Sequence, residues 1–137
     1  MKPSAIRAHL LKQHERIRQR LGMTEDLAER LLAGEAVRLS LGDAVFALLR
    51  ELFEHNRSEE ALLEPLLRAG DDYSSQRVSR MLEEHCAEHA LLRDGLRGHD
   101  LDSVAQRMPE LAESLRAHMD AEERTFLHAA VVRDPPD

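Results

Sequence analysis

Apolar residues recur at intervals of three and four residues in four successive segments of the chain, and this spacing constrains the fold more than any other feature. It places the apolar side chains of each segment on one face of a helix, which must be buried. The first segment runs from about Ser4 to Leu32. Four amphipathic helices joined by short connections predict an all-α fold, namely an up-down-up-down antiparallel four-helix bundle.

Capping and helix-breaking residues predict the ends of the second and third helices. Ser40 is a suitable N-cap for the second helix, and Pro65 is expected to kink its last turns because proline cannot donate a backbone hydrogen bond. Ser74 or Ser75 is expected to cap the third helix, which ends near residues 95–98. The predicted core stripe of the second helix consists of Val45, Leu48, Leu52, His55, Glu59, Leu62 and Leu66.

The fourth helix contains a proline that bears on where it begins. We expect Pro109 in its first turn, where a missing N–H costs little, with an earlier start near Ser103 as the alternative. The predicted stripe of this helix extends to Ala129. A chain of 137 residues can bury a core of its own, so we expect one domain over residues 1–137, with a frayed tail at 132–137.

Composition excludes several classes of partner. The net charge of −7 and the lack of a basic stripe disfavour a nucleic-acid partner. No apolar run approaches the length of about 18 residues that a membrane span needs, and the N-terminus lacks the pattern of a secretory signal. The single cysteine cannot form an internal disulfide, which favours a reducing, cytoplasmic location.

Histidines and glutamates occupy positions in these stripes where apolar residues are expected. A buried polar group without a partner costs about 2–7 kcal/mol, so each of these residues either has a partner or is not buried. Residues from all four helices contribute, and each lies near the middle of its helix. A shared metal site explains them more economically than independent accidents. The seven candidate ligands are His14, His55, Glu59, His85, His89, His118 and Glu122.

The chemistry of these groups narrows the choice of metal. Five imidazoles and two carboxylates exceed what one zinc ion takes, which is about four ligands. They suit two ions of iron-like character, with bridging carboxylates and terminal imidazoles. Cys86 lies about 100° around the helix from His85, so it is expected to flank the site and not to enter it.

The order and spacing of these residues resemble the hemerythrin-like (HHE cation-binding) family. The resemblance covers nearly the whole chain and includes the segments Phe53-Glu54-His55, Glu59-Glu60, Leu63-Glu64-Pro65 and Glu84-His85. It implies a non-haem centre of two iron ions inside the bundle. By this resemblance His85, His89 and His118 hold one ion and His14 and His55 hold the other. Glu59 and one carboxylate of the fourth helix bridge them, and one coordination position stays open for a small ligand such as dioxygen.

Two features depart from the oxygen carriers of that family. In the oxygen carriers that this chain resembles, the last helix carries a His-x4-Asp pattern. The residue here that matches its Asp is Glu123. Helical periodicity instead favours Glu122, four residues after His118, so both carboxylates stay open. The aromatic lining is also thin, with three Phe, one Tyr and no Trp.

These observations predict a binding protein whose iron pair takes up dioxygen or nitric oxide for storage, delivery or sensing. A redox enzyme that uses the same centre for peroxide or nitric-oxide chemistry is one alternative. An iron-responsive interaction module, ordered when metal binds, is the other. Neither a nucleic-acid nor a membrane partner is expected, and the sequence predicts no particular protein partner.

Overall fold

The computed structural model of the protein describes residues 1–69, 76, 79–84, 86–87, 90 and 100–136. Its elements are helix α1 (Pro3–Leu32), helix α2 (Arg38–Ser58), the π-helix η1 (Glu59–Leu63), helix α3 (Glu64–Arg68) and helix α5 (Leu101–Arg124). Residues 79–84, in the predicted third helix, are helical. The described ranges contain no strand, so the all-α prediction is confirmed.

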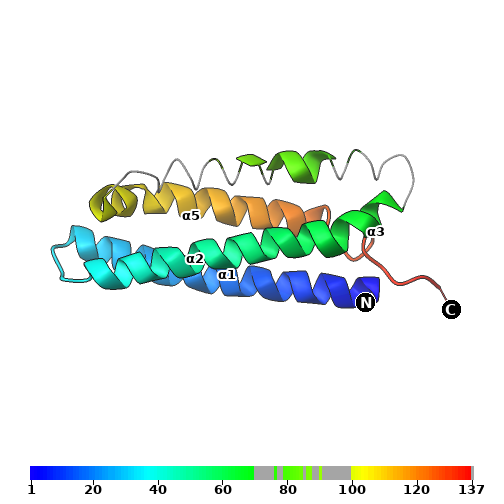
Figure 1. Ribbon diagram of the computed structural model, residues 1–137, viewed down its shortest axis with the longest axis horizontal. Coiled ribbons are helices and arrows are strands. Elements are labelled where there is room, and N and C mark those ends of the chain that lie inside the picture. The colour runs from blue at the N-terminus through cyan, green and yellow to red at the C-terminus, as the bar shows by residue number, and fades with distance from the viewer. Residues whose placement is uncertain (70–75, 77–78, 85, 88–89, 91–99, 137) are drawn as a thin grey trace.

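The long helices lie side by side along the long axis of the molecule (Figure 1). Helix α1 runs antiparallel to both α2 and α5 and packs against both of them, whereas α2 and α5 touch each other only slightly. Helices α2 and α5 therefore lie diagonally across the bundle. Among the described residues, no helix is both long enough and apolar enough to cross a membrane.

The connection between α1 and α2 is closed by a glycine in the left-handed region. Gly34 has φ of 91°, which side chains with a Cβ rarely adopt. Its N–H donates to the Leu31 carbonyl and the Glu35 N–H donates to the Arg30 carbonyl, both at 3.0 Å. These two bonds form a Schellman motif, which satisfies the last carbonyls of α1.

The predicted Ser40 cap of the second helix is wrong. Helix α2 begins at Arg38 with Val37 as its N-cap, and the Leu41 N–H already bonds the Val37 carbonyl at 2.9 Å. The chain reversal at Gly34 is complete early enough for the helix to begin before the serine. The position of the turn therefore outweighs the capping preference of the side chain.

The predicted first turn at Pro109 is also wrong, and the earlier start is closer to the structure. Helix α5 begins at Leu101, and the Asp100 side chain caps it by accepting a bond from the Ser103 N–H at 2.9 Å. Pro109 lies inside the helix. Burial of Val104 and Met108 in the preceding turns stabilises the helix and offsets the cost of that proline.

The core stripe of the second helix changes phase at the π-helix η1. Before it, Leu48 and Leu52 are buried as predicted, but after it Leu63 and Leu67 are buried in place of the predicted Leu62 and Leu66. A π-helical turn holds one more residue than an α-turn, so it moves every later side chain by one position around the axis. Pro65, two residues after η1, has no N–H to donate to that turn, and the disturbance expected near it is a π-helix and not a simple kink.

The end of the chain also differs from the expectation. Helix α5 stops at Arg124, so Ala129 lies exposed in a turn and not in the core stripe. Val132 is buried, and Asp134 accepts bonds from the Ser4 N–H at 2.9 Å and from the Ser4 hydroxyl at 2.7 Å. These contacts hold the first part of the predicted frayed tail, residues 132–137, against the start of α1.

Buried apolar side chains form two clusters, one toward each end of the bundle. The first cluster contains Ile17, Leu21, Ala28, Leu41, Leu48, Leu52, Val104, Ala105, Met108, Leu111, Ala112, Leu115 and Met119. The second cluster contains Ile6, Leu10, Leu63, Leu67, Met81, Phe126, Leu127 and Val132. A layer of buried polar residues lies between them along α1, α2 and α5.

Candidate metal centre

Four of the predicted ligand residues converge in this polar layer. His14 comes from α1, His55 from α2, Glu59 from the first position of η1 and Glu122 from α5. None is more than 2% exposed, and one ligand atom of each lies within 4.8 Å of those of the others. Two imidazoles and two carboxylates at this separation match the donor set of a metal ion with nitrogen and oxygen ligands.

The geometry of the four groups is compact. The Nε2 atoms of His14 and His55 lie 3.0 Å apart, and His55 Nε2 lies 2.7 Å from Glu59 Oε1. Glu122 Oε1 is 3.5 Å from His14 Nε2 and 3.8 Å from His55 Nε2. Carboxylate lone pairs and imidazole nitrogens therefore face one small volume from four elements of the bundle.

The surroundings of Glu122 test whether a cation fits this volume. Neither of its buried carboxylate oxygens makes a hydrogen bond of good geometry within the described ranges, although His118 Nε2 lies 3.1 Å from Oε1. A buried carboxylate without good donors is costly, and a bound cation would satisfy both oxygens. The donor set and the poorly satisfied carboxylate both fit a metal ion.

A polar side chain behind His55 fixes the orientation of its ring. His55 Nδ1 donates to Gln13 Oε1 at 2.9 Å, and Gln13 Nε2 donates to the Ser58 hydroxyl at 3.0 Å. The Ser58 hydroxyl in turn donates to the Glu54 carbonyl at 3.0 Å. Because Nδ1 carries this bond, Nε2 is the nitrogen that faces the centre, as in metal sites whose histidines are held by an outer partner.

Glu123 plays the corresponding part for His14. Its Oε2 lies 3.2 Å from His14 Nδ1, and Arg18 pairs with the same carboxylate. Arg18 Nη2 also donates to Asp120 Oδ1 at 2.8 Å. Glu123 is 30% exposed on its side chain and lies on the outer side of the His14 ring, whereas Glu122 lies on the inner side.

The electrostatics of the cluster favour a proton on His55 and a charge on Glu122. Burial alone lowers the pKa of His55, but the neighbouring carboxylates of Glu122 and Glu59 more than offset it and raise the pKa from 6.5 to about 10. Burial raises the pKa of the Glu122 carboxyl, but its interactions with Glu59 and with the neighbouring imidazoles outweigh that effect. That pKa is held well below its usual range.

The remaining predicted ligands are placed as follows. His118 Nε2 lies 3.1 Å from Glu122 Oε1, and its side chain is 16% exposed at the edge of the cluster. His85 and His89 lie outside the described residues. Cys86 is exposed. His118 and Glu122 both lie on α5, and the structure therefore places His118 beside the same carboxylate oxygen that His14 and His55 approach.

Sequence reasoning missed the outer contacts of the cluster. Gln13 and Arg18 were not singled out, because they flank the stripe of α1 and their partners come from other elements. A polar residue next to a buried histidine is too common to indicate such a role. Glu123 was considered only as an alternative ligand, and its position behind His14 was not predicted.

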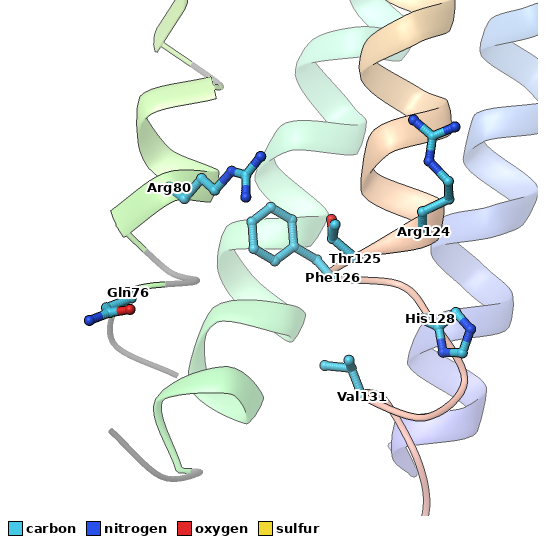
Figure 2. Close-up of a pocket in the computed structure, with 7 residues that line it drawn as sticks. All are labelled: Gln76, Arg80, Arg124, Thr125, Phe126, His128 and Val131. Atoms are coloured by element: carbon cyan, nitrogen blue, oxygen red, sulfur yellow. The ribbon is translucent and has the colours of Figure 1, made fainter. Parts of the chain in front are cut away.

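A separate pocket opens between Gln76 and Arg80 on one side and the end of α5 with the segment after it on the other (Figure 2). It has a volume of about 510 Å³, and Figure 2 shows the Phe126 ring projecting toward Arg80. None of the four converging residues lines it. The pocket is lined by Gln76, Arg80, Arg124, Thr125, Phe126, His128 and Val131.

Comparison with known proteins gives one match. The model of a family described as the hemerythrin HHE cation binding domain matches residues 5–130. No curated protein and no solved structure is significantly similar to the chain. The matched range includes all of the residues that converge in the polar layer.

Proposed function

The chain belongs to the hemerythrin HHE cation-binding domain family, and from this we propose that its buried centre holds two non-haem iron ions and binds dioxygen or nitric oxide. The observation that carries the proposal is the convergence of His14, His55, Glu59 and Glu122, from α1, α2, η1 and α5, on one buried volume. Family membership and the cluster together indicate metal binding. The number of ions, their identity and the diatomic ligand are the parts that we propose.

The arrangement of donors supports two ions over one. His14 and His55 present their Nε2 atoms to one side of the cluster, and Glu59 and Glu122 lie beside them, where their carboxylates would be shared between two ions. His118 approaches the same Glu122 oxygen and would serve the second ion together with His85 and His89. This division follows the ligand pattern of carboxylate-bridged iron pairs in helical bundles.

The chain's own residues would keep the centre dry and ordered. Leu10 and Ile17 flank His14 on α1, and Leu52 precedes His55 on α2; all three are at most 1% exposed. When bound, the iron pair supplies electrons and an open coordination position for the ligand. Gln13 and Glu123 would hold the two imidazoles in place, which limits the reorganisation that ligand binding requires.

The first test is the metal content. Protein produced with adequate iron is expected to contain about two ions per chain by elemental analysis, because the seven ligand candidates exceed what one ion takes. His55→Ala should lose iron, whereas His128→Ala, at an exposed histidine, should keep it. Reproducible binding of a single zinc ion, with no second site that can be filled, would refute the iron-pair proposal.

The second test separates binding from catalysis. Iron(II) is added to the metal-free protein without air, dioxygen is then admitted, and the absorption spectrum is followed through repeated cycles of air and argon. A binding protein should form and release its complex repeatedly without consuming reductant. Sustained turnover of peroxide or nitric oxide, many times per centre, would instead support the alternative of a redox enzyme.

A further inference from the structure

The outer face of α2 exposes three large apolar side chains. Leu39 is 86% exposed, Phe46 is 68% exposed and Phe53 is 46% exposed. They are seven residues apart, which is nearly two turns of helix at about 3.6 residues per turn, so they form one continuous stripe. Two of the chain's three phenylalanines lie in it. Exposed aromatic residues in a row are typical of an interaction surface.

Charged residues of opposite sign lie between these apolar positions. Asp43 follows Leu39 by four residues, and Arg50 follows Phe46 by four. Asp43 forms no ion pair with any residue that the structure describes, and Arg50 has only Glu54, at 3.6 Å on the open surface. The five residues alternate at spacings of four and three, the heptad spacing of a helix-pairing seam. We call Leu39, Asp43, Phe46, Arg50 and Phe53 the α2 seam.

The α2 seam is complementary to itself when it is reversed. We propose that it is the surface on which a second copy of this chain docks, with the two α2 helices antiparallel. A two-fold axis at Phe46 places the two Phe46 rings together and sets Leu39 of one copy against Phe53 of the second copy. It also sets Asp43 within about one residue's rise, about 1.5 Å, of the level of Arg50 of the second copy, twice by symmetry.

The charges favour this occupant over a lipid surface. Helices that lie on membranes flank their apolar stripe with lysine and arginine, whereas the α2 seam carries one acid and one base, and the chain has a net charge of −7. The first turn of α2 is also held in place, because Arg38 Nη2 donates to both carboxylate oxygens of Asp102, at 3.1 and 2.9 Å. Leu39 therefore lies on an anchored turn.

Docking at this face would leave the buried centre intact. At about 100° per residue, His55 and Glu59 lie on the side of the helix opposite to the α2 seam. A single pair of helices buries an area near the low end of protein interfaces, about 1,000 Å², so we expect a dimer with a dissociation constant in the micromolar range.

Charge reversal tests the register in the metal-loaded full chain by sedimentation equilibrium over a range of concentrations. Asp43→Arg and Arg50→Asp, each alone, turn two attractive contacts into repulsive ones and should weaken the dimer about tenfold. The double variant, Asp43→Arg with Arg50→Asp, should restore the affinity to within about threefold of the original. A mixture of the two single variants should associate with each other more tightly than either does alone. Single variants that do not weaken the dimer, or a double variant that does not restore it, would overturn the antiparallel register.

Truncation of the central ring tests the surface itself. Phe46→Ser should weaken the dimer about a hundredfold, and Met23→Ser, at a residue of α1 that is 56% exposed, should leave it unchanged. Circular dichroism and thermal melting of each variant show that the bundle remains folded, since both residues are exposed. A chain that is monomeric up to millimolar concentration overturns the proposal, as does a dimer that Phe46→Ser leaves intact.

Discussion

The proton on His55 makes the stability of the metal-free protein depend on pH in an unusual direction. His55 Nε2 lies 2.7 Å from Glu59 Oε1 and 3.8 Å from Glu122 Oε1, and the attraction of these two carboxylates raises its pKa to about 10. In the unfolded chain the same group has a pKa of about 6.5. Between these two values the folded protein holds a proton that the unfolded chain has lost, so folding is favoured by protons.

The sign and size of the effect follow from these two pKa values. The stabilisation by His55 is complete below the unfolded pKa of about 6.5 and is lost as the pH rises toward the folded pKa. The free energy of unfolding can fall by at most about 1.4 kcal/mol per pH unit from one proton. We expect the free energy of unfolding to fall by about 2 kcal/mol between about pH 7 and about pH 9. A protein without such a shifted group changes little in stability over this range.

Urea unfolding of the metal-free protein, followed by circular dichroism at several pH values, measures this dependence. The variant His55→Gln should remove most of the slope, and His128→Gln, at an exposed histidine, should keep it. The iron-loaded protein should show the opposite trend, because metal binding displaces the His55 proton and tightens as the pH rises. A free energy of unfolding that is constant or rises over this range in the metal-free protein would refute the assignment of the proton.

Three further predictions concern the ligands and the core. Glu122→Ala should lose most of the second ion, whereas Glu123→Ala should keep both ions and bind them about tenfold more weakly, as measured by elemental analysis and chelator competition; the reverse result would exchange their roles. His89→Ala should lower both the iron content and the melting temperature of the loaded protein, and unchanged values would remove it from the site. Leu63→Ala should lower the free energy of unfolding in urea by about 2–5 kcal/mol and Leu62→Ala by about 1 or less, because only Leu63 is fully buried; equal losses would contradict the phase change at η1.

Periodicity predicted the helices well wherever the helix is regular. Helix α1, predicted from about Ser4 to Leu32 and observed over Pro3–Leu32, follows a repeat of 3.6 residues that the sequence displays directly. The buried positions Leu48 and Leu52 of α2 follow the same repeat. Prediction failed after Glu59, because a π-turn adds one residue and the pattern of leucines suits either register. Leu62 and Leu63, like Leu66 and Leu67, are adjacent leucines. Only packing against the second apolar cluster decides which of each pair is buried.

Helix ends and outer contacts were harder to predict, for a different reason. Ser40 and Pro109 are good local signals, but the start of α2 depends on the turn at Gly34 and the start of α5 on the stronger cap at Asp100. Spacing on one helix predicted the inward position of Glu122. It carries no information about Arg18, whose contact with the Glu123 carboxylate joins residues that are 105 positions apart.

The division of the apolar core has a mechanical consequence. Helix α1 runs through both apolar clusters, and the buried polar layer separates one cluster from the other. A metal ion bound in the polar layer would link the helices there, so that strain applied to one apolar cluster passes to the other. Without the ion, the second apolar cluster, which lies nearer the chain ends and has fewer buried side chains, can loosen while the first keeps its packing. Metal binding would then tighten the packing at the end of the bundle that holds both termini, far from the turn at Gly34.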